Sequence, residues 1–117
     1  MSNLTLRYEI ARAAYEGRDY TEAARALEEI LLDLAGEDIL HGTSDLRLLL
    51  ARAYFHSAQL GRAERVLEGL VVDEPADPYV RLLLARTLQR QSRHAEAKPH
   101  ASLAQALGAD TSSTVRA

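Results

Sequence analysis

Apolar residues recur at intervals of three and four along most of this chain, with short polar breaks between the runs. Leu46, Leu49, Leu50 and Ala53 form one such stripe. This spacing places apolar side chains on one face of an α-helix. The pattern predicts six amphipathic helices, over residues 3–16, 20–35, 45–57, 60–72, 78–91 and 94–107.

The polar breaks between these helices are only a few residues long. Gly17 marks the first break. Pro75 and Pro78 lie in a segment that ends one predicted helix and begins the next. Pro78 suits the first turn of a helix, where its missing N–H costs nothing. Because short connections force neighbouring helices to run antiparallel, the sequence predicts three helical hairpins and an all-α fold.

A short segment recurs along the chain. Residues 46–52 (LRLLLAR) return as residues 80–86 (VRLLLAR), 34 residues later. An earlier echo, residues 6–12 (LRYEIAR), lies 40 residues before the middle copy. A period of this size indicates a stacked array of helical hairpins, and the longer first interval indicates a six-residue insertion near residues 38–43.

The composition fits an all-helical protein of one domain. The chain has 117 residues, of which 47% are hydrophobic, which is enough for a modest core. Aromatic residues make up only 5%, whereas the strong helix formers Ala, Leu, Arg and Glu are abundant. We therefore expect a folded helical domain and no β-sheet.

The net charge and the absence of cysteine limit the kinds of binding partner and the cellular compartment that we expect. The formal net charge is −3, whereas nucleic-acid binding needs a basic surplus or a dense basic patch. There is no cysteine, no visible secretory signal, and no apolar run long enough to span a membrane. These features predict a cytoplasmic protein that binds neither nucleic acid nor membrane.

No pattern for catalysis stands out. The sequence has no glycine-rich phosphate loop, nucleophile elbow or zinc signature. None of the four histidines, which are His41, His56, His94 and His100, pairs with another at the spacing of one helical turn. We therefore predict no enzyme activity, no metal, no cofactor and no small-molecule substrate.

The repeated unit resembles the tetratricopeptide repeat, a 34-residue helix–turn–helix motif, over nearly the whole chain. The middle unit supplies the family's positions with Arg47, Leu50, Ala51, Tyr54, Ala63, Leu67, Leu70 and Pro75. The first unit matches with Arg7, Ile10, Ala11, Ala14, Ala23, Leu27 and Ile30, and the third with Arg81, Leu84, Ala85, Leu88, Ala97, Ala101 and Ala104.

The resemblance implies one domain over residues 1–109, of the small bacterial type. Its three repeats would cover about 4–37, 44–77 and 78–111, followed by a polar, flexible tail at 110–117. The hairpins would stack into a right-handed superhelix, an α-solenoid, with small residues such as Ala51 and Ala63 where helices approach closely. Arg7, Arg47 and Arg81 would lie between hairpins with packed stems. Pro99 is a departure from the family pattern: it falls inside the last predicted helix, where it removes a backbone hydrogen bond and predicts a kink.

The resemblance also implies a concave groove lined by the first helix of each hairpin. In this chain its residues would be Tyr8, Arg12, Tyr15, Leu48, Arg52, Phe55, Tyr79, Leu82 and Arg86. Stacking would align three arginines beside apolar residues, which suits an acidic or mixed acidic–apolar peptide of a protein partner. The alternative is that these arginines pair with Glu9, Glu16 or Asp45 and only solvate the groove.

Two functions remain open at this point. The first is a non-catalytic adaptor or scaffold that binds protein in the groove. The carboxylate clamp of some family members is absent, because only Arg12 matches it. The second is a self-assembling module that forms a homodimer through exposed faces at the ends of the array. One candidate face carries His94, Ala97, Ala101, Leu103, Ala104 and Leu107, unless the preceding helix covers its apolar side.

Overall fold

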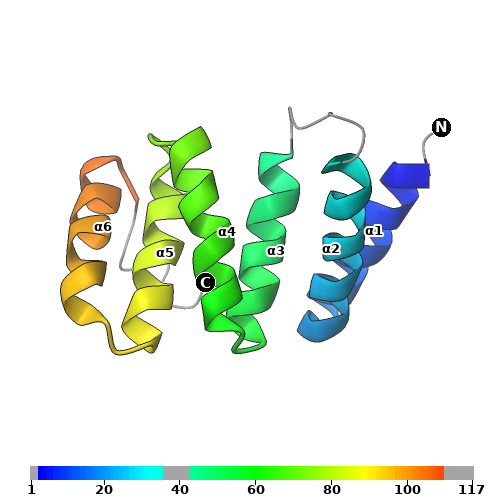
Figure 1. Cartoon of the computed structure of the whole chain (residues 1–117), viewed down its shortest axis with the longest axis horizontal. Coiled ribbons are helices and arrows are strands. Elements are labelled where there is room, and N and C mark those ends of the chain that lie inside the picture. Colours follow the sequence, from blue (N-terminus) through cyan, green and yellow to red (C-terminus); the bar gives the residue numbers. More distant parts are fainter. Residues whose placement is uncertain (1–2, 36–42, 110–117) are drawn as a thin grey trace. The chain divides into compact units, whose positions relative to one another are not determined.

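The computed structural model describes residues 3–35 and 43–109, and within them the chain is all α-helical (Figure 1). The helices are α1 (Asn3–Glu16), α2 (Tyr20–Ala35), α3 (Ser44–His56), α4 (Leu60–Asp73), α5 (Pro78–Arg90) and α6 (His94–Ala106). Their order and bounds confirm the six predicted helices to within about one residue at each end.

The chain divides into two compact units, Met1–Gln59 and Leu60–Ala117. The first unit contains α1, α2 and α3, and the second contains α4, α5 and α6. The boundary follows Gln59, in the turn of the second predicted repeat, so each unit holds one complete hairpin and one further helix.

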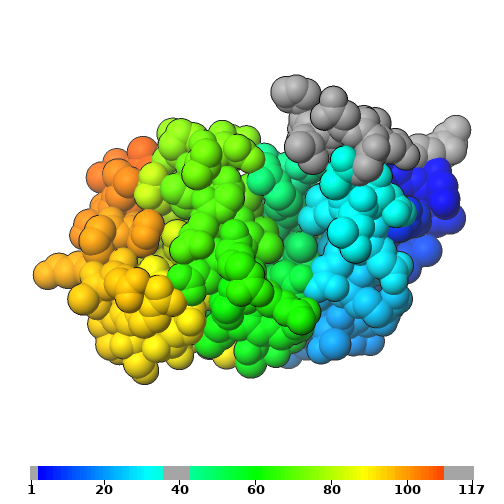
Figure 2. All heavy atoms as spheres, viewed as in Figure 1, coloured from blue at the N-terminus to red at the C-terminus, as the bar shows by residue number. Residues whose placement is uncertain are grey.

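In the first unit, α1 and α2 form an antiparallel hairpin, and α3 packs against α2. In the view of Figures 1 and 2, α2 lies in front of part of α1. An Arg7 Nη1 atom near the start of α1 lies 2.7 Å from Asp33 Oδ2 near the end of α2. The Tyr54 hydroxyl of α3 donates to the Glu28 carboxylate of α2. These contacts fix the order α1–α2–α3 within the unit.

Small residues set the close approach of α1 and α2. Ala11 and Ala23 are fully buried, and Leu27 and Ile30 of α2 complete the core of this unit together with Leu50 of α3. A larger side chain in place of Ala11 or Ala23 would push the two helices apart, because protein interiors have almost no free volume. Their burial agrees with the small residues that the repeat pattern predicts at these places.

In the second unit, α5 lies between α4 and α6. The helix begins as expected: Pro78 is in its first turn, and Asp77 accepts from the backbone amides of Tyr79 (2.9 Å) and Val80 (3.3 Å). Seven of its thirteen residues are buried, so α5 is the core helix of this unit. Leu82 packs in one cluster with Ala104 of α6 and with Ala109, which follows the end of α6.

Three turns share one backbone geometry. Arg18, Ala58 and Ser92 have φ of 68°, 63° and 62°, in the left-handed region. The backbone amide of each of these three residues donates to the carbonyl three residues earlier. The backbone amide of the residue that follows donates to the carbonyl five residues before itself. This pair of hydrogen bonds is typical of the Schellman motif, in which the residue with positive φ is usually glycine because glycine has no Cβ to clash. The repeat is therefore visible in the backbone as well as in the sequence.

Several details correct or extend the sequence predictions. The head groups of Arg7 and Arg81 contact the second helix of their own hairpin, since Arg7 pairs with Asp33 and Arg81 Nη1 lies 3.4 Å from His100 Nδ1 of α6. The predicted place of their stems between hairpins stays a prediction. Ala97 and Ala104 are buried, which removes them from the predicted exposed face of α6. The helix continues through Pro99 without interruption. The insertion near 38–43 and the tail at 110–117 fall almost entirely outside the described residues.

Within the described ranges, no helix combines the length and the apolar character that crossing a membrane requires.

Candidate functional site

The first unit has a hollow between α1 and α3, with a volume of about 260 Å³. Tyr8 and Arg12 line it from α1. The residues that line it from α3 are Asp45, Leu48, Leu49 and Arg52. The structure therefore brings together four of the predicted groove residues, which are Tyr8, Arg12, Leu48 and Arg52. On each helix these side chains are three or four residues apart, so they share one face.

A second hollow of about 270 Å³ continues the first toward the beginning of α1 and α3. Its lining includes Leu4, Thr5 and Leu46 in addition to Tyr8 and Asp45, which the two hollows share. The α1–α3 groove is the continuous surface that these two hollows form. It is apolar near Leu4 and Leu46 and cationic near Arg12 and Arg52, so it offers two kinds of contact to one extended ligand.

The two arginines of the α1–α3 groove differ in their partners. Arg12 lies 3.3 Å from the Glu16 carboxylate and places its guanidinium 6.0 Å from the centre of the Tyr8 ring. Arg52 is half-buried and makes no ion pair with any carboxylate in the part of the chain that the structure describes. Intramolecular pairing therefore accounts for Arg12, whereas the charge of Arg52 is not paired with a carboxylate of the described residues.

An aromatic cluster lies beyond Arg52, at the ends of α1 and α3. The His56 ring stacks on Tyr20 at 4.7 Å and meets Tyr15 edge-on at 6.0 Å. Phe55 meets His56 at 5.4 Å. Burial raises the pKa of Tyr15, while the Arg52 charge opposes that rise. The predicted residues Tyr15 and Phe55 thus belong to an aromatic cluster with Tyr20 and His56, and they do not line the two hollows of the groove.

The three predicted groove residues of the second unit lie in different surroundings. Tyr79 is half exposed, at 50%. Arg86 is half-buried and lines a hollow between α5 and α6. Leu82 is only 5% exposed, because its side chain packs with Ala104 and Ala109. Leu82 therefore contributes to the core of this unit and little surface to a ligand.

The hollow between α5 and α6, called the α5–α6 pocket below, has a volume of about 220 Å³. Its lining residues are Leu82, Ala85, Arg86, Gln89, Lys98, Ala101, Ser102 and Gln105. Sequence reasoning missed the α6 side, because the family's groove is assigned to first helices. The signal was Ala101, which stands where the other two repeats have Leu27 and Leu67, both fully buried.

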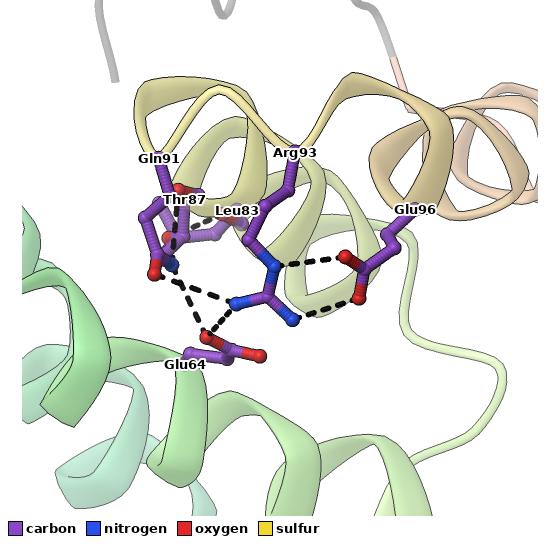
Figure 3. A network of polar contacts seen from close by, with 6 residues as sticks. All are labelled: Glu64, Leu83, Thr87, Gln91, Arg93 and Glu96. Atoms are coloured by element: carbon purple, nitrogen blue, oxygen red, sulfur yellow. Dashed lines mark hydrogen bonds and ion pairs between the residues drawn. The ribbon is translucent and has the colours of Figure 1, made fainter.

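A polar network stabilises the other side of the second unit (Figure 3). Arg93 Nη1 donates to Glu64 Oε1 at 2.7 Å, and Arg93 also makes two hydrogen bonds with the Glu96 carboxylate. Gln91 Nε2 donates to the same Glu64 oxygen at 3.1 Å. The Arg93 guanidinium lowers the pKa of Glu64 and of Glu96. Since its charges pair with one another, this network ties α4 to the α5–α6 turn.

Glu64 and Glu96 also line a separate hollow of about 210 Å³, together with Glu68 and His100. Burial lowers the pKa of His100, and the charge of Arg81 adds to that effect. In the described ranges no group of three or more histidine, aspartate or glutamate side chains is arranged to hold a metal ion.

Comparison with known proteins supports the repeat. Residues 42–87 match a family model described as tetratricopeptide repeat. The fold is similar to the Yersinia enterocolitica type III secretion translocator chaperone SycD, with a TM-score of 0.77, 23% identity, and coverage of 92% of this chain and 77% of that one. No curated protein matches the sequence at a significant level.

Two MamA structures are also similar in fold. MamA of MSR-1 has a TM-score of 0.77 at 18% identity, with coverage of 90% of this chain and 57% of that one. MamA of AMB-1 has a TM-score of 0.77 at 19% identity, with coverage of 91% and 59%. This chain therefore spans less than two thirds of the length of either MamA protein.

Proposed function

We propose that the protein is a non-catalytic adaptor or scaffold that binds a protein partner, and the match of residues 42–87 to a tetratricopeptide repeat model within an all-helical chain supports this proposal. Tetratricopeptide arrays mostly present binding surfaces and rarely carry out chemistry. The α1–α3 groove is the proposed binding surface, and its ligand is an acidic or mixed acidic–apolar segment. The cytoplasmic location stays a prediction from the sequence.

The observation that carries this proposal is the half-buried Arg52 guanidinium, which has no carboxylate partner among the described residues. Its fork of N–H donors matches a carboxylate in two parallel hydrogen bonds, and partial burial strengthens the attraction. Leu48 and Leu49 lie in the same hollow and would contact apolar side chains of the ligand. Asp45 would repel a carboxylate at the opposite end, which gives the ligand a preferred orientation.

The test uses a short labelled peptide of alternating glutamate and leucine, with a glutamine–leucine peptide as the neutral control. Fluorescence anisotropy should show tighter binding of the acidic peptide. Arg52→Ala should weaken that binding by about tenfold, because each 1.4 kcal/mol of lost interaction is one factor of ten. The affinity of Arg52→Lys should lie between those of the wild type and Arg52→Ala, since lysine keeps the positive charge but lacks the forked pair of N–H donors.

Arg25→Ala is the matched control, because Arg25 is an exposed arginine of α2 that pairs with Glu22 and Glu29. It should leave peptide binding unchanged. Equal binding of the acidic and neutral peptides, or an equal effect of Arg25→Ala and Arg52→Ala, would rule the groove out as the carboxylate site.

Self-association is the second candidate. Leu6 and Ile10 are large apolar residues exposed on α1, and Leu103 is exposed on α6. The SycD structure that resembles this fold is described as a dimer. Sedimentation at several protein concentrations tests the idea, and a monomer of constant mass at all of them would remove it.

A further inference from the structure

The α5–α6 pocket exists because one side chain is small. In the first two repeats, Leu27 and Leu67 occupy the matching place and are fully buried. The third repeat has Ala101 there, and Ala101 lines the pocket. Ala85, on the facing side of α5, is also small. Two alanines opposite each other leave room between the flanking side chains that leucine would fill.

The side chains around this room are cationic or neutral donors. Arg86 and Gln89 line it from α5, and Lys98, Ser102 and Gln105 line it from α6. On each helix these residues are three or four apart, so they face one hollow. The lining has two positive charges and no carboxylate. Lys98 makes no hydrogen bond or ion pair with another residue in the described ranges.

From this arrangement we infer that the α5–α6 pocket is an anion-binding site that accepts a glutamate or aspartate side chain of a protein partner. Lys98 and Arg86 supply the opposite charge. The Ser102 hydroxyl and the amide groups of Gln89 and Gln105 supply neutral hydrogen bonds. All of its residues belong to the second unit, so the site does not depend on the α1–α3 groove.

The lining favours a carboxylate over a phosphate. A carboxylate carries one negative charge and accepts hydrogen bonds from amide, hydroxyl and cationic donors together. Ala85 and Ala101 form an apolar floor that suits the methylene groups of a glutamate side chain. A phosphate group carries more charge and usually calls for a denser set of arginines or backbone amides.

The experiment is an NMR titration of the full chain with the blocked tripeptide Ala-Glu-Ala, beside Ala-Gln-Ala and inorganic phosphate. Ala-Glu-Ala should shift the amide signals of Gln89, Ser102 and Gln105 in a saturable way, and Ala-Gln-Ala should not. Lys98→Gln should weaken this binding by up to about fivefold, as expected for one exposed charge pair, while Lys98→Arg should retain it.

Two further variants separate the possible outcomes. Ala101→Leu should fill the pocket and abolish the response, and its circular dichroism spectrum should match that of the wild type. Arg52→Ala should leave the response intact, so a failure of the groove proposal would not be mistaken for a failure here. The inference is overturned if phosphate alone saturates the site, if Lys98→Gln has no effect, or if Ala101→Leu folds normally and still responds.

Discussion

The helices α1 and α5 occupy the same place in their repeats and differ sharply in burial. Leu6 of α1 is 61% exposed, whereas the matching Val80 of α5 is 1% exposed. Ile10 is 58% exposed, and its counterpart Leu84 is 2% exposed. The reason is the neighbours, because α5 packs between α4 and α6 while α1 packs mainly on α2. An apolar residue at the same repeat position can therefore belong to the core in one unit and to the surface in the other.

This difference in burial separates core packing, which dominates in α5, from the presentation of side chains at the surface, which dominates in α1. In the second unit, α5 buries most of its side chains, and its contribution to the α5–α6 pocket comes mainly from the polar side chains of Arg86 and Gln89. In the first unit, α1 buries only Ala11 among its residues and can present Tyr8 and Arg12 to the α1–α3 groove. A repeat pattern alone treats the two helices as equivalent, and only the packing shows which side chains of each helix remain accessible to a ligand.

The largest expected effect tests the burial difference directly. Leu84→Ala should lower the free energy of unfolding by about 2–4 kcal/mol, because it removes buried methylene groups and leaves a cavity. Ile10→Ala should cost less than about 0.5 kcal/mol, as is usual for an exposed position. Urea unfolding followed by circular dichroism measures both. Similar losses for the two variants would contradict the assignment of α5 as core and α1 as surface.

A smaller effect compares one ion pair from each unit. Glu64→Gln should cost about 1 kcal/mol, since the Glu64 carboxylate is half-buried and accepts from Arg93 and Gln91. Glu29→Gln, which breaks an exposed pair with Arg25 on α2, should cost less than about 0.5 kcal/mol. Urea unfolding at neutral pH measures the difference.

The pH dependence of the free energy of unfolding tests whether the charge of Glu64 causes the effect of Glu64→Gln. Its pKa is lowered in the folded protein, so its stabilising contribution is complete above the ordinary glutamate pKa of about 4.3 and is lost as the pH falls through the folded value. The stability gap between wild type and Glu64→Gln should therefore be constant at neutral pH and shrink as the pH falls through the lowered pKa of Glu64. A gap that persists in acid would show that shape, and not charge, determines the effect.

The smallest expected effect concerns the turns, where the two units are alike. Arg18→Gly and Ser92→Gly should each stabilise the protein by about 0.5–1 kcal/mol, because glycine adopts positive φ without a Cβ clash. Thermal unfolding should show similar gains in both units. Ala95→Gly, inside α6, is the matched control and should destabilise by about 1 kcal/mol. Opposite signs for Arg18→Gly and Ser92→Gly would show that the two turns are not equivalent.

The sequence predicts the helices well, since their limits depend on local signals such as Pro78, Gly17 and the apolar spacing. It also predicts which side chains of α1 and α3 share a face, because a helical period fixes that relation. The site is harder to predict. Leu82 is buried by Ala104 and Ala109, which lie more than twenty residues away. The α5–α6 pocket lies at Ala101, where the other repeats have leucine; the sequence shows this substitution, but only the packing of α5 and α6 shows that the space stays open.

The turns centred on Arg18 and Ala58 are 40 residues apart, whereas those at Ala58 and Ser92 are 34 apart, yet their backbone geometry is the same. The extra residues fall between the end of α2 at Ala35 and the start of α3 at Ser44. For protein engineering, this connection is the natural place to insert a reporter or an affinity tag. Doubling the length of a loop costs only about 0.6 kcal/mol of closure entropy, and no described helix would have to change.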